Sequence, residues 1–372
     1  MERSDHEGEG IVQQGAGVKT KSFDTLPESL RHRWGVILAG GDGTRLQPLT
    51  RLACGDDRPK QFCPLLGGKT LLAYTQQRIS RSIDEDRMLF VLTRKHEPFY
   101  RQELVHVPRI QKVVQSKNQG TLPAILWSLL RLSRSDPRAL VAFFPSDHFF
   151  VHEDKFTSTV ERAFDYVGES RDSVVLLGAS AERPETEYGW IEPEHNSENE
   201  FGREFAPVRR FWEKPARPIA QELLGMGCLW NTFVMVGSVS AFLDMIRHTS
   251  PVLFHTFEPV FSSADPELEE QKMQLVYDTL GPADFSREVL ASSTERLLVA
   301  NFGEVGWSDL GEPRRFIKAL AENGSEDPWA AADICNRCGL THGQIVTLSG
   351  QSSAGAIFEE RAVSRVLFDH AV

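Results

Sequence analysis

The chain has 372 residues, a formal net charge of −11 and 41% hydrophobic residues, which leaves room for one large globular domain and a small appendage. Acidic residues outnumber basic ones and no basic patch stands out, so the composition argues against a nucleic-acid partner. The sequence shows neither a signal-peptide pattern nor a run of about 18 apolar residues. We therefore expect a cytoplasmic protein that does not span a membrane.

The alternation of strands and helices predicts the fold class. Residues 1–33 are polar and glycine-containing and predict a flexible N-terminal segment. The expected elements that follow are a strand at 36–39, a helix at 71–79, strands at 88–93 and 112–115, a helix with Thr121 as its N-cap, a strand at 140–144, a helix at 156–167 and a strand at 173–178. This order predicts an α/β domain over residues 34–315, with a Rossmann-like, mainly parallel mixed sheet flanked by helices.

The second half of the chain is less regular. Residues 181–215 are polar, aromatic and proline-containing, and we expect them to form a substrate lid. A strand at 229–236, a helix at 239–246 and a polar helical region to about residue 280 come next. Residues 316–372 are expected to form a small C-terminal region of uncertain fold, which could mediate a homodimer.

Cysteines give little functional information. The chain has five, an odd number in a protein large enough to be stable without disulfides, so we expect reduced thiols. Cys335 and Cys338 have the spacing of half a zinc site, but no second pair completes four ligands. We assign them no function.

The loop after the first strand combines glycines with basic residues. Gly40, Gly41 and Gly43 allow a positive φ and a close approach of backbone N–H groups to an anion. Arg45 can grip two phosphate oxygens with its planar fork, whereas Lys60 is a mobile point charge. The combination predicts phosphate binding of the kind that phosphoryl or nucleotidyl transfer requires.

Two better-known glycine motifs do not fit this chain. A Rossmann dinucleotide fingerprint needs a third glycine where Leu46 stands. A P-loop ending at residues 67–70 would need its first glycine where Cys63 stands. We interpret residues 67–70 as a turn that leads into a helix.

The glycine loop is the first of six motifs that together resemble a known family. GGDGTRLQPLT at residues 40–50, followed by RPKQF, resembles the sugar-nucleotide pyrophosphorylases, nucleotidyltransferases which join a nucleoside triphosphate to a sugar 1-phosphate. The later segments that match, in the family's order, are residues 144–148, 188–192, 211–215, 230–231 and 306–311. FPSDH at 144–148 is more similar to the mannose-1-phosphate guanylyltransferase branch than to the thymidylyl or uridylyl branches. The resemblance implies that residues 34–315 form a nucleotidyltransferase domain.

The resemblance implies a reaction that needs charge neutralisation more than acid–base chemistry. Mannose 1-phosphate would attack the α-phosphorus of GTP, giving GDP-mannose and pyrophosphate. The attacking phosphate has a second pKa of about 6 and is already ionised at neutral pH, so no side chain has to act as a base. Arg45 would then stabilise the departing pyrophosphate, and Lys60 the α-phosphate.

The resemblance also assigns a metal and the binding residues. Mg²⁺ prefers hard oxygen ligands and needs only one or two carboxylates besides substrate phosphates, so Asp147 and Asp309 are its expected ligands, while His148 is interpreted as a packed neighbour. The residues implied for the nucleotide are Leu38, Ala39, Gly40, Gly41, Gly43, Thr44, Asn118, Gly120, Thr121 and Ser146. Those implied for the sugar phosphate are Tyr188, Gly189, Glu213, Lys214 and Asn231.

Departures from the family pattern leave specificity open. In the base-contacting loop, glycine precedes Thr121 and Leu122 replaces a small residue; Thr232 and Phe233 follow Asn231 where serine and glycine are more usual. One alternative is therefore the same chemistry with another nucleotide or sugar 1-phosphate. The other is a catalytically silent regulatory subunit that binds a nucleotide sugar.

Overall fold

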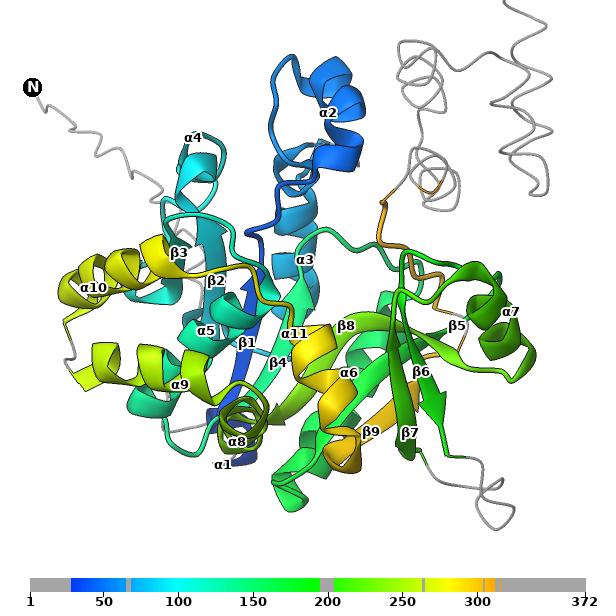
Figure 1. The fold of residues 1–372 in the computed structure, drawn as a ribbon. Helices are drawn as coiled ribbons and strands as arrows, with labels where there is room; N and C mark the ends of the chain where they lie inside the picture. Colours follow the sequence, from blue (N-terminus) through cyan, green and yellow to red (C-terminus); the bar gives the residue numbers. More distant parts are fainter. Residues whose placement is uncertain are drawn as a thin grey trace, which may run out of the picture.

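The computed structural model describes residues 28–64, 68–194, 204–262, 265–303, 305–311 and 315. The predicted C-terminal region at 316–372 and the Cys335–Cys338 pair lie outside the described residues. At the other end, Glu28–Arg31 forms α1 and β1 begins at Arg33, so ordered structure starts before Trp34. The described strands form one nine-stranded sheet in the order β3-β2-β1-β4-β8-β5-β9-β7-β6 (Figure 1).

The first half of the sheet is parallel, as predicted. Its strands, paired in the order β3-β2-β1-β4, are β1 (Arg33–Leu38), β2 (Met88–Thr93), β3 (Lys112–Gln115) and β4 (Leu140–Pro145). Every residue of β2 is buried, as expected for a parallel strand covered on both faces. The carboxyl ends of these strands lie at one edge, where open α/β sheets bind their ligands.

The second half of the sheet is largely antiparallel, so the expectation of a mainly parallel sheet holds only for the first half. The long strand β8 (Leu229–Ser238) runs antiparallel to both β4 and β5 (Val174–Ser180), while β9 (Leu297–Asn301) is parallel to β5. A mixed α/β architecture with a Rossmann-like sheet is nevertheless confirmed.

The lid predicted for residues 181–215 is wrong for residues 189–193 and 206–213. β6 (Gly189–Pro193) and β7 (Ala206–Glu213) are antiparallel strands of the sheet, and β6 also pairs with β8. Aromatic residues that suggested a lid are instead packed: Tyr188 and Trp190 form a buried cluster with Trp230 and helix α7 (Arg217–Gly225). Burial of these large rings holds the segment against the sheet.

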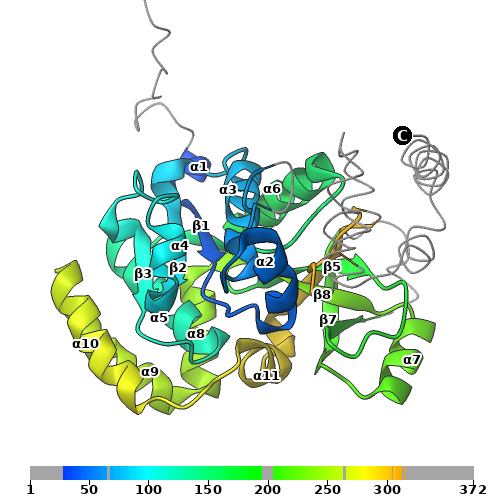
Figure 2. The same cartoon turned by 90° about the horizontal axis from the view of Figure 1, so that it is seen from above.

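Helices cover both faces of the sheet (Figure 2). Alternate strand residues point to opposite faces, so Val36 and Ile37 of β1 enter two different apolar clusters. The helices on the Val36 side are α5 (Thr121–Ser135), α8 (Val239–Thr249), α9 (Pro251–Phe257), α10 (Pro266–Thr279) and α11 (Phe285–Glu288). Those on the Ile37 side are α3 (Leu71–Ile79), α4 (Glu97–Tyr100) and α6 (Glu153–Glu169).

Short helices lie in the segment that connects the glycine loop to Lys60. α2 (Gln47–Cys54) follows the glycine loop and the 3-10 turn Thr44–Leu46, and a second 3-10 turn, Lys60–Phe62, follows α2. Among the helices of the described residues, none combines the length and apolarity needed to cross a bilayer.

Candidate active site

The glycine loop lies at the carboxyl end of β1, and side chains of two other segments donate hydrogen bonds to its backbone carbonyl groups. The Gln61 amide donates to the carbonyl oxygens of Ala39 at 3.1 Å and Gly41 at 2.8 Å, and the Thr93 hydroxyl donates to that of Gly40 at 2.8 Å. No described residue accepts a hydrogen bond from the N–H of Gly40 or Gly41. These N–H groups are therefore available to an anion, as the sequence predicts.

The residues at either end of this loop have different environments. Leu38 and Ser146 lie at its base, where the Ser146 N–H donates to the Leu38 carbonyl at 3.1 Å and links β1 to the loop after β4. Gly43 has φ 59°, and a Cβ there would come within 3.3 Å of the backbone nitrogen of Lys60. Thr44 is exposed. A glycine at position 43 thus lets the loop approach the lysine segment closely.

Lys60 connects the two predicted metal ligands. Its Nζ lies 3.1 Å from Asp147 Oδ2 and donates to the backbone carbonyl of Asp309. Asp147 follows β4 and Asp309 lies in the loop after β9; these loops meet because Phe149 and Ser308 exchange two backbone hydrogen bonds of 2.8 and 3.0 Å. The structure therefore brings together the predicted catalytic lysine and both carboxylates.

Arg45 lies apart from this group, at the exposed rim. Its guanidinium is 3.1 Å from Glu187, and both side chains are at least half exposed. An exposed ion pair of this kind is worth about 0–1 kcal/mol, so a phosphate can take the place of Glu187 at little cost. Glu187 precedes Tyr188 in the chain, so the Arg45 guanidinium lies beside the segment that carries this predicted sugar residue.

His148 is a packed and hydrogen-bonded neighbour, as predicted, with a side chain that is 11% exposed. The Trp307 indole donates to its Nδ1 at 3.2 Å, which leaves the proton of the neutral ring on Nε2, 3.8 Å from Asp147. Burial lowers the pKa of His148 to about 4, against the opposing effects of Asp147 and Asp309. The ring is therefore neutral at pH 7.

Asp309 is ionised and tightly held. Burial raises its pKa, but the charges of Lys60 and Arg315 and a hydrogen bond from Tyr188 outweigh it, so the pKa lies below the usual range for aspartate. Oδ1 accepts from Arg315 Nη1 at 2.6 Å, the Tyr188 hydroxyl at 2.7 Å and the Gly311 N–H at 3.0 Å. The Asp309 carboxylate thereby links the region around Lys60 and Asp147 to Tyr188.

The chemistry of these carboxylates fits Mg²⁺. Asp309 Oδ2 accepts no hydrogen bond from a described residue, and the Asp147 side chain is 30% exposed. Within the described ranges no group of three or more His, Cys, Asp or Glu side chains is arranged to hold a metal. Two carboxylates completed by phosphate oxygens and water are a donor set that suits Mg²⁺ rather than zinc.

The predicted sugar residues converge where β6, β7 and β8 meet. A Cβ on Gly189 would come within 3.1 Å of Glu213 Oε2 and 3.3 Å of Asn231 Cβ, so only glycine leaves space beside both polar side chains. Lys214 follows Glu213, with its Nζ 3.5 Å from the carboxylate. Burial raises the pKa of Glu213, and nearby Asp284 raises it further.

Three non-glycine residues at or near these predicted ligands have a left-handed backbone conformation. Lys214, Phe233 and Leu310 have φ of 47°, 60° and 47°. Lys214 is itself a predicted sugar-phosphate ligand, Leu310 follows Asp309, and Phe233 lies two residues after Asn231. A non-glycine residue in this region costs about 1–3 kcal/mol and persists where function or packing requires it.

Glu213→Gln is expected to raise the melting temperature at pH 7 while weakening sugar-phosphate binding. Folding disfavours the ionised carboxylate, because the pKa of Glu213 is raised, and glutamine removes the charge. The gain is fully present above the folded-state pKa and disappears below the ordinary glutamate pKa of about 4.3, where both states are protonated. Thermal melts at pH 4 and pH 7 check this; an equal gain at both would contradict it.

The base loop is joined to both the glycine loop and α11. Asn118 Oδ1 accepts from the Gly120 N–H at 3.0 Å, and its amide donates to Asp42 at 3.3 Å. The expectation that Thr121 is the N-cap of α5 is wrong: Gly120 is the cap and Thr121 the first helical residue. The Thr121 hydroxyl instead accepts from the Phe285 N–H at 2.8 Å, because the α11 segment packs directly against the helix start.

Gly120→Ala is expected to destabilise the protein by about 2 kcal/mol and to raise KM for the nucleotide. Gly120 has φ 85°, and an added Cβ would lie 2.2 Å from the Ala283 carbonyl oxygen, so the loop must move. Chemical denaturation and substrate kinetics check both effects. Gly225→Ala is the matched control, because open space surrounds that position; a loss as large in the control would contradict the explanation.

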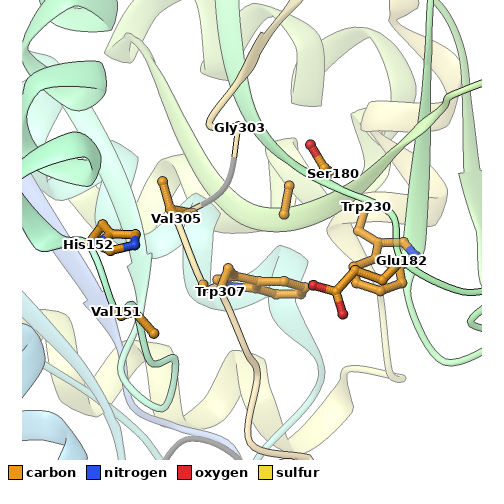
Figure 3. Close-up of a pocket in the computed structure, with 10 residues that line it drawn as sticks. Val151, His152, Ser180, Glu182, Trp230, Gly303, Val305 and Trp307 are labelled. Atoms are coloured by element: carbon orange, nitrogen blue, oxygen red, sulfur yellow. The ribbon is translucent and has the colours of Figure 1, made fainter. Parts of the chain in front are cut away.

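A cavity of 460 Å³ lies beside this site (Figure 3). Trp230 and Trp307 form part of its lining, together with Ser180 and Glu182, and none of the predicted site residues lines it. Both indoles also pack against the Tyr188 ring, with centroids 5.2 and 5.0 Å away. The tryptophans therefore lie between the cavity and the residues that contact Asp309.

Two residues that position the site are absent from the sequence-based set. Gln61 holds the glycine-loop carbonyls, and its place in the RPKQF motif was an available signal. Arg315, which contacts Asp309, Tyr188 and Glu185, gives no local signal, because its partners are brought to it only by the fold.

Comparisons with known proteins identify the family of the chain. The nucleotidyl transferase family model matches residues 34–326. Mannose-1-phosphate guanylyltransferase 2 of Escherichia coli O157:H7 is 28% identical over 284 residues, and alginate biosynthesis protein AlgA of Pseudomonas fluorescens is 28% identical over 281 residues. Each alignment covers 74% of this chain, but only 57% and 56% of the respective relative. The chain thus spans little more than half the length of these relatives.

A solved structure gives the same result for the fold. It is described as a mannose-1-phosphate geranyltransferase from Thermus thermophilus and superposes with a TM-score of 0.67 at 25% identity. The alignment covers 78% of this chain and 79% of that one. The similarity therefore extends over most of the described domain.

Proposed function

The chain belongs to the nucleotidyl transferase family, and from this premise we propose that it forms GDP-mannose and pyrophosphate from GTP and mannose 1-phosphate. The observation that carries the proposal is the contact of Lys60 with both Asp147 and Asp309 at the carboxyl edge of the sheet. A lysine that pairs with the Asp147 carboxylate and donates to the backbone carbonyl of Asp309, beside a loop with free N–H groups, provides charges of the kind that transfer at an α-phosphorus requires.

The glycine loop and two basic residues would bind the triphosphate. The N–H groups of Gly40 and Gly41 would hold phosphate oxygens, and Arg45 would exchange Glu187 for the departing pyrophosphate. Lys60 would leave Asp147 to neutralise the α-phosphate as its fifth oxygen approaches. Bound Mg²⁺, held by Asp147 and Asp309, would neutralise phosphate charge and help to align the reacting groups.

The sugar phosphate would enter from the β6–β8 side. Glu213 and Asn231 would hydrogen-bond sugar hydroxyls beside Gly189, and Lys214 would contact the phosphate. Because that phosphate is ionised at neutral pH, the site needs no general base, in agreement with a neutral His148 that is packed against Trp307. The in-line geometry then depends on how rigidly these groups are held.

The preference for GTP and mannose 1-phosphate is supported by the relatives' names and by the FPSDH segment. Phe233, which is bulkier than the usual residue there and has φ 60°, is the feature that favours a different sugar. A catalytically silent subunit would have no need of Arg45, Lys60, Asp147 and Asp309 together, and the Lys60 contacts argue against it.

Pyrophosphate release with Mg²⁺ is the decisive test. GTP, ATP, UTP and dTTP are each paired with mannose 1-phosphate and with glucose 1-phosphate, beside Asp147→Asn as the inactive control. Turnover that peaks on GTP with mannose 1-phosphate supports the proposal. Turnover on another pair keeps the chemistry and reassigns the pocket, whereas tight GDP-mannose binding without any turnover would show a regulatory subunit.

A further inference from the structure

Arg315 is held firmly beside the carboxylate pair. It is only 7% exposed, its Nη2 lies 2.6 Å from Glu185 Oε2, and its guanidinium stacks over the Tyr188 ring at 4.7 Å. Glu185 and Tyr188 both lie in the segment that leads into β6, so Arg315 is fixed to the segment that carries the predicted sugar residue Tyr188. These contacts hold the arginine in place independently of Asp309.

The arginine reaches Asp309 at one oxygen only. Oδ1 receives Arg315 Nη1 at 2.6 Å together with the Tyr188 hydroxyl and the Gly311 N–H. Oδ2 lies on the other side, against Gly311, where an added Cβ would come within 2.5 Å of it. Three donors fix Oδ1, whereas Oδ2 accepts no hydrogen bond from a described residue, so Oδ2 is the oxygen left for coordination.

We propose that Arg315 is a positioning residue that fixes Asp309 through Oδ1 so that Oδ2 faces the divalent cation. The inference rests on the proposed function, because Asp309 is taken as a ligand of the cation in that reaction. The contacts of Arg315 themselves are observed in this chain. It also gives Tyr188 a role, because the same hydroxyl that binds Asp309 is in contact with Arg315. The predicted metal ligand Asp309 and the predicted sugar residue Tyr188 are thereby both held by the Arg315 guanidinium.

The opposite role, in which Arg315 competes with the cation, fits the geometry less well. A competitor would have to leave when the cation binds, and Arg315 is anchored by a second ion-pair partner, Glu185, whose side chain is only 12% exposed. Lys60, in contrast, forms one ion pair among the described residues, with Asp147, and its other contact is a hydrogen bond to the backbone carbonyl of Asp309. Lys60 is therefore the group that moves, and Arg315 the group that stays.

Direct metal binding tests the proposal without relying on turnover. Mn²⁺ is titrated against the full chain, without substrates, and followed by electron paramagnetic resonance. Arg315→Met is expected to weaken Mn²⁺ binding about tenfold, the lower end of the effect of removing a group that orients a metal ligand. Arg315→Lys is expected to restore part of it. Unchanged or tighter binding in Arg315→Met, or no binding by the wild type, overturns the proposal.

Kinetics supply a second readout. In pyrophosphate release, Arg315→Met is expected to raise the Mg²⁺ concentration for half-maximal rate with a smaller change in KM for GTP. Arg183→Met is the matched control, because Arg183 also pairs with Glu185 at 3.2 Å but is 46% exposed; it is expected to leave the metal dependence unchanged, and a shift as large as that of Arg315→Met overturns the proposal.

These experiments also separate the two proposals. If the wild type turns over GTP and mannose 1-phosphate but Arg315→Met binds metal normally, the positioning role fails and the function stands. If the wild type shows no turnover, the function fails, and the Mn²⁺ comparison still decides the role of Arg315. Should Arg315→Met not fold, Arg315→Lys and Glu185→Gln carry the comparison, each with an expected partial loss of Mn²⁺ affinity; wild-type affinity in both overturns it.

Discussion

Lys60→Met is expected to lower turnover of GTP and mannose 1-phosphate by about 10²–10³-fold, the usual effect of removing one preorganised charge from a transition state. Methionine keeps most of the length and apolar volume of the lysine, whose side chain is 9% exposed, so the fold should survive. The charge that reaches Asp147 and the backbone of Asp309 is lost. KM should change less than the turnover number, because the contribution is made at the α-phosphorus during the reaction.

Steady-state pyrophosphate release measures this effect, and thermal melting confirms that the variant is folded. Lys69→Met is the matched control: Lys69 is exposed and bonds only to Gln77 at 3.1 Å and the Tyr74 ring among the described residues. Its turnover should equal that of the wild type. Turnover by Lys60→Met within tenfold of the wild type would rule out the role assigned to the lysine.

Asp147→Asn is the second change with a large expected effect, a loss of about 10²-fold or more in turnover. Asparagine has nearly the same size, but it removes the charge that Lys60 contacts at 3.1 Å and one of the two carboxylates that fit Mg²⁺. Two losses are therefore expected together: a lower maximal rate, and a higher Mg²⁺ concentration for the half-maximal rate.

Rates measured over a range of Mg²⁺ concentrations separate these two losses. Asp154→Asn is the control, because Asp154 is 90% exposed and pairs with Arg81, which follows α3 in the chain. Its rate and Mg²⁺ dependence should both match the wild type. A normal Mg²⁺ dependence in Asp147→Asn would show that this carboxylate does not hold the metal, even if the rate falls.

Local sequence patterns predicted the structure correctly where apolar residues or glycines dominate a short segment. The predicted bounds of α3, β2 and β3 agree with the structure, because apolar runs between turns leave little choice for buried parallel strands and their helices. The glycine loop was recognisable for a similar reason, since only glycine permits the close backbone approach seen beside Lys60.

Patterns failed where packing between distant segments decided the outcome. Residues 189–193 and 206–213 looked like a lid because they are aromatic and lie between polar stretches, yet β6 and β7 pair with each other and join the sheet. Thr121 looked like an N-cap, but its hydroxyl binds the Phe285 N–H. In both cases a partner far along the chain competed with the local preference and won.

The amino-acid sequence was sufficient to predict the class of protein, to single out the glycine loop as a candidate phosphate site and to identify the charged residues, because these depend on residue type and short spacing. The fold was needed to show that Lys60 contacts the Asp147 carboxylate and the Asp309 backbone, that Gln61 and Arg315 hold the loop and the Asp309 carboxylate, and that His148 is neutral. The reason is physical: distances between loops depend on which strands pair, and protonation depends on burial and on charges brought near by the fold.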